Sequence, residues 1–357
     1  MGIYVSMRFL TPLIASLIHQ ALPVLDLIWS FAFLNCFFWF GGMLVAYGIG
    51  LRFGGRVSGF LCGLFYTTSI SVLAYGDAVL TDSSGYFFVG LALYFALRQS
   101  EFSKLRTSLG SAILAIGGFC HPTSFLASLF YLFSTLKYRW KVLWALAGAG
   151  LVLVLVLEVV DILTNGVLRN LPSFAWARFV YSAQSLNRPG LGLPIELAWT
   201  FDLFPIQALD QLRGVRVPVG TDPVRDTLEF ACFVVTAVVG FWYAGGHRKL
   251  LTLYLPFLAL FPFLAPFFID RYLFTLWPFF IPVLVTGVRN IARLPAKAVL
   301  LFLKKTRLSA GLALANPDLY AIIFLFAIAI RNSLFAIGLD HTAITLIYLG
   351  PSFILRP

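Results

Sequence analysis

Charged side chains are scarce in this 357-residue chain and make up only 11% of it, whereas a soluble domain carries about 25%. Hydrophobic residues reach 60% and mean hydropathy is +0.90. One buried core cannot absorb so apolar a sequence, because the surface around it would lack polar residues. The composition therefore excludes an ordinary cytosolic enzyme, a nucleic-acid-binding module and a disordered protein. It predicts a polytopic membrane protein.

Familiar catalytic and metal-binding motifs are also lacking. The four cysteines lie within apolar runs without the C-x-x-C spacing of metal ligands. The sequence contains no G-x-x-x-x-G-K-[ST] phosphate loop, no H-E-x-x-H and no G-x-S-x-G. These absences argue against a P-loop nucleotidase, a zinc protease of this type and an α/β-hydrolase. The first residues, MGIYVSMRFLTP, do not form a cleavable signal peptide.

Long apolar runs are abundant, and about 20 such residues suffice for a membrane-spanning helix. We therefore predict an all-α, polytopic transmembrane helix bundle with about ten or eleven spanning or half-spanning helices plus interfacial helices. Run 9–22 is short and favours an interfacial helix or half-span. Runs 109–120 and 122–136 meet at His121-Pro122, which predicts two short helices or one kinked helix. The remaining runs are 27–50, 57–75, 84–97, 142–164, 227–245, 250–268, 272–288, 318–330 and 333–350.

Basic residues concentrate in five turns between these runs. They comprise sixteen of the 26 lysines and arginines, at 52–56, 98–106, 137–141, 248–249 and 289–307. If 109–136 is a hairpin, all five turns lie on one side, which the positive-inside rule makes cytoplasmic. The net charge of +11 is therefore a sign of topology and does not indicate a nucleic-acid partner.

The opposite side, outer or lumenal, receives most of the remaining acids and the long segment 165–226. The prolines and aromatic residues of this segment predict an ordered loop with short interfacial helices. We thus divide the chain into an N-terminal transmembrane part (1–164), this outer loop (165–226) and C-terminal transmembrane helices (227–357).

Two acidic residues, Asp77 and Asp82, stand five positions apart between two apolar runs on the predicted outer side. Paired carboxylates at the start of a helix are suited to hold a divalent cation, or a phosphate-bearing substrate through such a cation. The alternative role is structural, because Asp82 is also a good N-cap for a helix that begins near Ser83. The two roles are compatible and both remain open.

Two basic sites complete the candidate set. The imidazole of His121 can bind a phosphate or transfer a proton, or His121 can cap the break that Pro122 imposes. Arg271, followed by Tyr272, can bind a phosphate or pyrophosphate through two guanidinium N–H groups. The alternative for this pair is a membrane-interface anchor neutralised by Asp270.

Taken in order, these segments resemble the GT-C glycosyltransferases. These are polytopic enzymes that use polyprenyl-phosphate sugars, akin to protein O-mannosyltransferases and the aminoarabinose transferase of lipid A. The resemblance covers residues 8–290. It rests on Arg8-Phe-Leu-Thr-Pro12-Leu-Ile-Ala15 (R-x-L-x-P-L-L-A), Gly48–Arg56 (R-x-G-G), Tyr75–Ser83 (Y-x-x-x-x-T-D-P/S), Gly117–Thr123 (T-R/K-P-T, with His121 at the basic position) and Arg271-Tyr272 to Pro278 (R-Y-L-x-P-x-x-P).

The resemblance implies inverting transfer of a sugar from its lipid phosphate to an acceptor hydroxyl on the outer or lumenal face. It assigns Asp82 or Asp77 as the second-loop catalytic acid that orients the acceptor or a divalent cation. It further assigns Arg271, His121 and Tyr272 to the donor phosphate, and the 165–226 loop to the acceptor. The bilayer and a polyprenyl-phosphate-linked sugar are then the expected partners, in a prokaryotic cell membrane or the endoplasmic reticulum.

The beginning of the chain departs from this pattern. In the family, the principal catalytic Asp lies in a first outer loop before the segment that matches Arg8, whereas here seven residues precede Arg8 and none is acidic. We expect a truncated gene product more than a non-catalytic relative. Two other classes stay open, a non-catalytic membrane subunit and a transporter or lipid flippase. For a transporter, Glu158 and Asp161 are the first residues to test.

Overall fold

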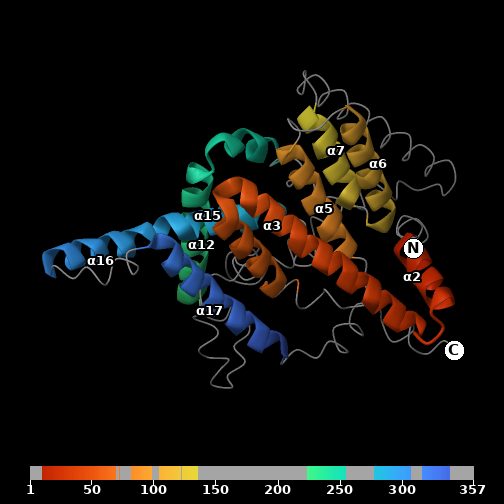
Figure 1. The fold of residues 1–357 in the computed structure, drawn as a ribbon, viewed down its shortest axis with the longest axis horizontal. Coiled ribbons are helices and arrows are strands. Elements are labelled where there is room, and N and C mark those ends of the chain that lie inside the picture. Colours follow the sequence, from red (N-terminus) through yellow and green to blue (C-terminus); the bar gives the residue numbers. More distant parts are fainter. Residues whose placement is uncertain are drawn as a thin grey trace.

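The structure is a computed structural model in which all described secondary structure is helical, as predicted (Figure 1). It describes residues 10–69, 72, 82–98, 104–121, 123–135, 223–254, 277–306 and 316–337. The main helices are α2 (Leu10–Ala21), α3 (Leu27–Thr68), α5 (Asp82–Leu97), α6 (Lys104–Cys120), α7 (Thr123–Thr135), α12 (Pro223–Tyr243), α15 (Trp277–Ile291), α16 (Arg293–Thr306) and α17 (Pro317–Ile337). Run 142–164, most of the expected outer loop and the boundary at 164–165 lie outside the described residues, whereas the boundary expected at 226–227 falls inside α12.

Helix α3 consists of two arms that fold back on each other at a glycine pair. Gly54 and Gly55 leave the helical backbone region, and Gly55 has φ = +76°, a conformation that favours glycine. Beyond this turn, a Cβ on Gly59 would lie 3.0 Å from the carbonyl oxygen of Tyr47 in the first arm. The arms are therefore antiparallel and closely packed, and the predicted turn between the two apolar runs is confirmed (Figure 1).

Helix α5 packs parallel to the first arm of α3 through small residues. A Cβ on Gly41 would lie 2.8 Å from the ring of Phe87, and one on Gly48 would lie 2.7 Å from the ring of Tyr94. Both contacts pair positions seven residues apart on each helix, so the two helices run in the same direction. The C-terminal end of α5 therefore lies beside the glycine turn of α3.

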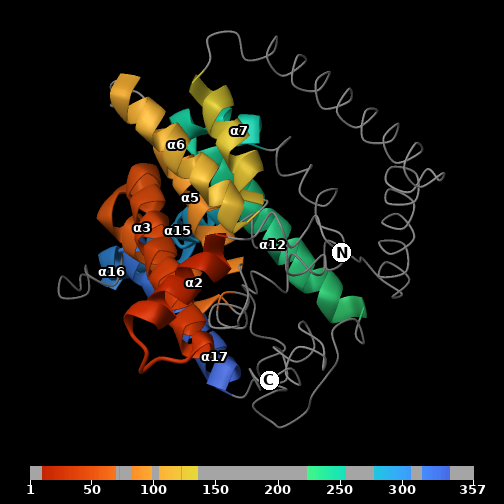
Figure 2. The same cartoon turned by 90° about the vertical axis from the view of Figure 1, so that its right-hand side faces the viewer.

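Helices α6 and α7 form the hairpin that the sequence left as one of two alternatives. Gly110 of α6 lies against Tyr131 of α7. A Cβ placed on Gly110 would lie 3.3 Å from the phenol oxygen of Tyr131. Gly110 and Tyr131 lie at nearly equal distances in sequence on either side of His121, so the chain reverses direction there. Gly117 in turn packs on the ring of Phe88. The break at His121-Pro122 thus produces two short antiparallel helices (Figure 2).

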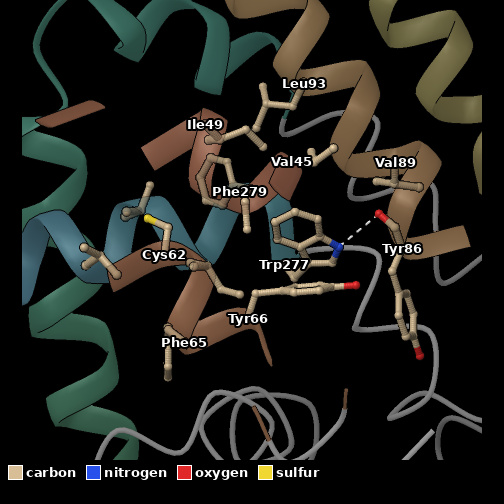
Figure 3. Close-up of a cluster of buried hydrophobic side chains, with 14 of the residues drawn as sticks. Val45, Ile49, Cys62, Phe65, Tyr66, Tyr86, Val89, Leu93, Trp277 and Phe279 are labelled. Atoms are coloured by element: carbon tan, nitrogen blue, oxygen red, sulfur yellow. Dashed lines mark hydrogen bonds between the residues drawn. The ribbon is translucent and has the colours of Figure 1, made fainter. Parts of the chain in front are cut away.

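Helices α12 and α15 pack closely through glycines. The rings of Phe233 and Phe280 lie 5.5 Å apart, and seven residues later a Cβ on Gly240 would lie 3.0 Å from the backbone nitrogen of Gly287. At such close approach, any larger side chain meets backbone, which cannot move aside as a side chain can. At the other end of α15, Trp277 is buried against Tyr66 and donates from Nε1 to the Tyr86 carbonyl at 3.1 Å (Figure 3).

Four expected boundaries are corrected. Helix α6 begins at Lys104 rather than near 109, because lysine and arginine are good helix formers and continue a helix beyond its apolar run. Helix α12 begins at Pro223, inside the expected loop 165–226, and proline is well suited to a first helical turn. The stretch 293–306, expected as a basic turn, is helix α16. Runs 318–330 and 333–350 were expected to be separate, yet α17 passes through the intervening Arg331-Asn332 without a break.

Candidate functional site

The described basic turns all meet at one end of the bundle. His247, in the turn after α12, stacks on Phe53 with ring centroids 4.8 Å apart, and its Nε2 lies 3.0 Å from the carbonyl oxygen of Arg52. The parallel packing of α5 brings Arg98 to the same end, and the α5–α6 hairpin brings Lys104 there. We call this the basic end. For the described basic turns, the prediction from charge that they lie on one common side of the bundle is therefore confirmed.

Arg289 joins three helices at the basic end. Its Nη1 donates to the Gly54 carbonyl at 2.8 Å and to Ser58 Oγ at 2.6 Å, both in the α3 turn. Its Nε and Nη2 lie 2.8 and 2.7 Å from one carboxylate oxygen of Asp318, at the start of α17. The exposed fractions are 22% for the Arg289 side chain and 29% for that of Asp318, so water competes only in part. Arg289 is therefore structural and lies away from the predicted site.

The opposite end holds the one sequence-predicted site residue whose side chain is described, His121. Its side chain is 1% exposed. A Cβ on Gly85 would lie 2.9 Å from both Cγ and Nδ1 of the imidazole, so the ring packs against the first turn of α5. That helix begins at Asp82, three residues before Gly85. The fold thus brings His121 to the helix end that carries Asp82, although 39 positions separate them in the sequence.

Small polar residues surround this contact, which we call the polar end cluster: Ser83, Ser84, His121 and Ser124. All four are buried. Ser83 and Ser84 follow Asp82 in α5, and Ser124 donates its backbone N–H to the His121 carbonyl at 2.9 Å. Sequence reasoning missed the serines as site members. Their positions beside Asp82 and beside His121-Pro122 were the available signal.

The other predicted site residues are only partly placed. Helix α5 begins at Asp82, one residue earlier than the helix expected to follow it, but the carboxylate itself is outside the described side chains. Asp77, Arg271 and Tyr272 lie outside the described residues. Within the described part of the chain, no group of three or more His, Cys, Asp or Glu side chains forms a metal site. A cation site at Asp77 and Asp82 therefore stays a prediction.

The outer surface of the bundle is apolar. Along the first arm of α3, large apolar side chains are exposed at every third or fourth position: Trp29, Phe33, Phe37, Phe40, Leu44, Tyr47 and Leu51. At 1.5 Å per residue this row is about 33 Å long, close to the roughly 30 Å hydrocarbon thickness of a bilayer. Soluble monomers rarely expose continuous apolar surface on this scale.

Two helical stretches, Leu27–Thr68 and Trp277–Leu303, are long and apolar enough to cross a membrane within the described residues. Each of them contains a turn, at Gly54-Gly55 and at Ala292 respectively. These stretches support association with a membrane. Comparison with protein-family models, with curated proteins and with solved structures finds no match to this chain.

Proposed function

We propose that this chain is a polytopic integral-membrane glycosyltransferase of the GT-C type, which moves a sugar from a polyprenyl-phosphate donor to an acceptor hydroxyl. One observation carries the proposal: His121 packs against the first turn of the helix that begins at Asp82, at the end opposite the basic turns. The GT-C resemblance assigns this pair to donor phosphate and second-loop acid. That assignment requires His121 and Asp82 to lie close together, and the sequence alone does not show whether they do.

The apolar exterior supports the membrane part of the proposal. A row of exposed aromatic and leucine side chains runs the length of the first α3 arm, between the Asp26 N-cap and Arg52. Charge separation adds an orientation, with the basic end cytoplasmic and the polar end cluster on the outer or lumenal side. A donor whose polyprenyl chain lies in the bilayer could place its phosphate at this level.

The proposed chemistry follows from the residue types. A carboxylate, Asp82 or Asp77, orients the acceptor or holds a cation. The base, which the resemblance places in the family's first outer loop ahead of the segment that matches Arg8, takes the acceptor's proton as the acceptor oxygen attacks the anomeric carbon. The bond from that carbon to the phosphate oxygen breaks, and the phosphate leaves with the electron pair. His121, together with Arg271 and Tyr272, contacts that phosphate and stabilises its charge. Burial of the serines keeps bulk water away from His121.

Transfer of radiolabelled mannose or aminoarabinose from its polyprenyl phosphate, by the full chain in proteoliposomes, tests the proposal. We expect Asp82→Asn to lower transfer about 100-fold and His121→Gln to lower it about tenfold or more. His247→Gln is the matched control, because it changes the same residue type at the basic end and should leave transfer intact. Unchanged transfer in both Asp82→Asn and Arg271→Ala would overturn the site assignment.

Transport remains a second candidate because of one observation in α17. Arg331 and Asn332 lie about 21 Å along this apolar helix from its start at Pro317, and Asn332 is buried. Ionisable groups deep within an apolar helix are typical of substrate or ion pathways. Solute uptake by proteoliposomes that fails in Arg331→Gln, without any sugar transfer by the parent chain, would favour this candidate.

A further inference from the structure

Helix α16 projects from the basic end of the bundle instead of packing along it (Figure 1). It begins directly after the turn at Ala292 that ends α15. Only a narrow face meets the protein, where Ala296 and Leu303 are buried next to α15 and α17. The rest of the helix surface is therefore left to its surroundings.

The exposed surface of α16 is strongly apolar on one side. Leu294 and Leu301, seven residues apart, follow one line along the helix and are 68% and 69% exposed. Phe302 is 61% exposed on the adjoining side. Three large apolar side chains in water would be unfavourable, by roughly 25 cal/mol for each Å² of apolar area. The face needs an apolar environment.

Two basic residues border this apolar face. Arg293 and Lys297, one helical turn apart, are both exposed, whereas the exposed Lys305 lies on the apolar side itself, one turn after Leu301 at the end of the helix. The 14 residues of α16 contain no acid. The guanidinium of Arg293 also lies 5.9 Å from the ring centroid of Tyr243, an exposed aromatic of α12. Arginine beside an exposed tyrosine is typical of the level of lipid headgroups.

We propose that α16 lies in the plane of the basic-side leaflet and binds anionic phospholipids. Leu294, Leu301 and Phe302 enter the acyl region, while Arg293 and Lys297 bind headgroup phosphates. Charge selects this occupant, since two α16 helices packed together would bring like charges into contact. The inference rests on the membrane placement proposed above, and it adds a lipid-binding site remote from the polar end cluster.

A spin label at Leu301→Cys measures the depth of α16 in the full chain. The labelled protein carries Cys36→Ala and Cys232→Ala, because these two cysteines are exposed or half-buried whereas Cys62 and Cys120 are buried. It is placed in nanodiscs of phosphatidylcholine, with or without phosphatidylglycerol. The ratio of the label's accessibility to oxygen and its accessibility to a water-soluble nickel chelate gives the depth. The immobilised and mobile components of the spectrum give the docked and free populations of α16.

We expect the label below the phosphate level, more fully docked with phosphatidylglycerol present. Arg293→Glu with Lys297→Glu should lower the docked-to-free ratio about fivefold or more for each cation removed. Lys249→Glu, an exposed cation of the same end outside α16, is the matched control and should change nothing. High salt should act in the direction of the double variant.

A second label, at Phe40→Cys in the exposed row of α3, separates two kinds of failure. If position 40 lies deep in the bilayer but position 301 contacts water in both lipids, the α16 proposal is wrong and the membrane placement stands. Should position 40 also contact water, the membrane placement itself fails. Spin–spin broadening at position 301 that disappears on dilution with unlabelled protein would indicate contact between copies and would overturn lipid binding.

Discussion

Arg289→Met removes a guanidinium that joins α3, α15 and α17 at the basic end. The Gly54 carbonyl and Ser58 Oγ each lose a donor, at about 0.5–1.5 kcal/mol per hydrogen bond. Asp318 loses its ion pair, which adds about 1 kcal/mol at this partial exposure. The methionine retains most of the apolar stem. We therefore expect the free energy of unfolding to fall by about 2–4 kcal/mol.

The assay is unfolding of the full chain in mixed detergent, by titration with sodium dodecyl sulfate. Asp318→Asn should cost only about 1 kcal/mol, since its amide oxygen still accepts from Arg289. The double variant should show a coupling energy of about 1 kcal/mol between the two residues. Arg293→Met is the control. This arginine follows Arg289 by four residues, is exposed, and its guanidinium lies over the ring of Tyr243.

A loss below about 0.5 kcal/mol in Arg289→Met, or equal losses in Arg289→Met and Arg293→Met, would refute this reasoning. Either result would mean that the α3 turn and α17 hold their positions without the guanidinium. The basic end would then be a consequence of helix packing alone.

Three further predictions concern packing and the apolar surface. Gly240→Leu should force α12 from α15 and cost about 3 kcal/mol or more in the same titration, whereas Gly246→Leu, in open space, should cost little. Trp277→Phe should cost about 1–3 kcal/mol, because a buried indole and its hydrogen bond to the Tyr86 carbonyl are lost. Phe40→Lys, near the middle of the exposed α3 row, should disfavour membrane insertion by about 2.5–3.5 kcal/mol in a translocation assay. Unaltered insertion would contradict the lipid exposure of that row.

Local signals in the sequence sufficed for the turns of the described bundle. Gly54-Gly55 marked a turn because consecutive glycines between apolar runs interrupt a helix. His121-Pro122 marked a break, as two short helices or one kinked helix, through the constraint that proline places on its neighbour. The common end of the basic turns followed from their charge. These features depend on a few adjacent residues and need no knowledge of tertiary contacts.

Features that depend on distant partners were not predictable. The pairing of Arg289 with Gly54 and Asp318 joins positions 235 and 29 residues away, and no local pattern encodes it. Helix α16 was missed because its basic residues favoured a turn, although its leucines at positions 294 and 301 have helical spacing. The contact of His121 with the start of α5 was expected only through the GT-C resemblance, since spacing along the chain gives no distance.

The central claim is that the bundle crosses a bilayer with the polar end cluster opposite the basic end. Cysteines at Val24, 94% exposed just before α3, and at Gly246, exposed in the turn after α12, test it most directly. Both are introduced with Cys36→Ala and Cys232→Ala, and a membrane-impermeant maleimide is applied to right-side-out and inverted vesicles. The account predicts labelling of Gly246→Cys only from the cytoplasmic side and of Val24→Cys only from the other. Labelling of both positions from the same side would contradict it.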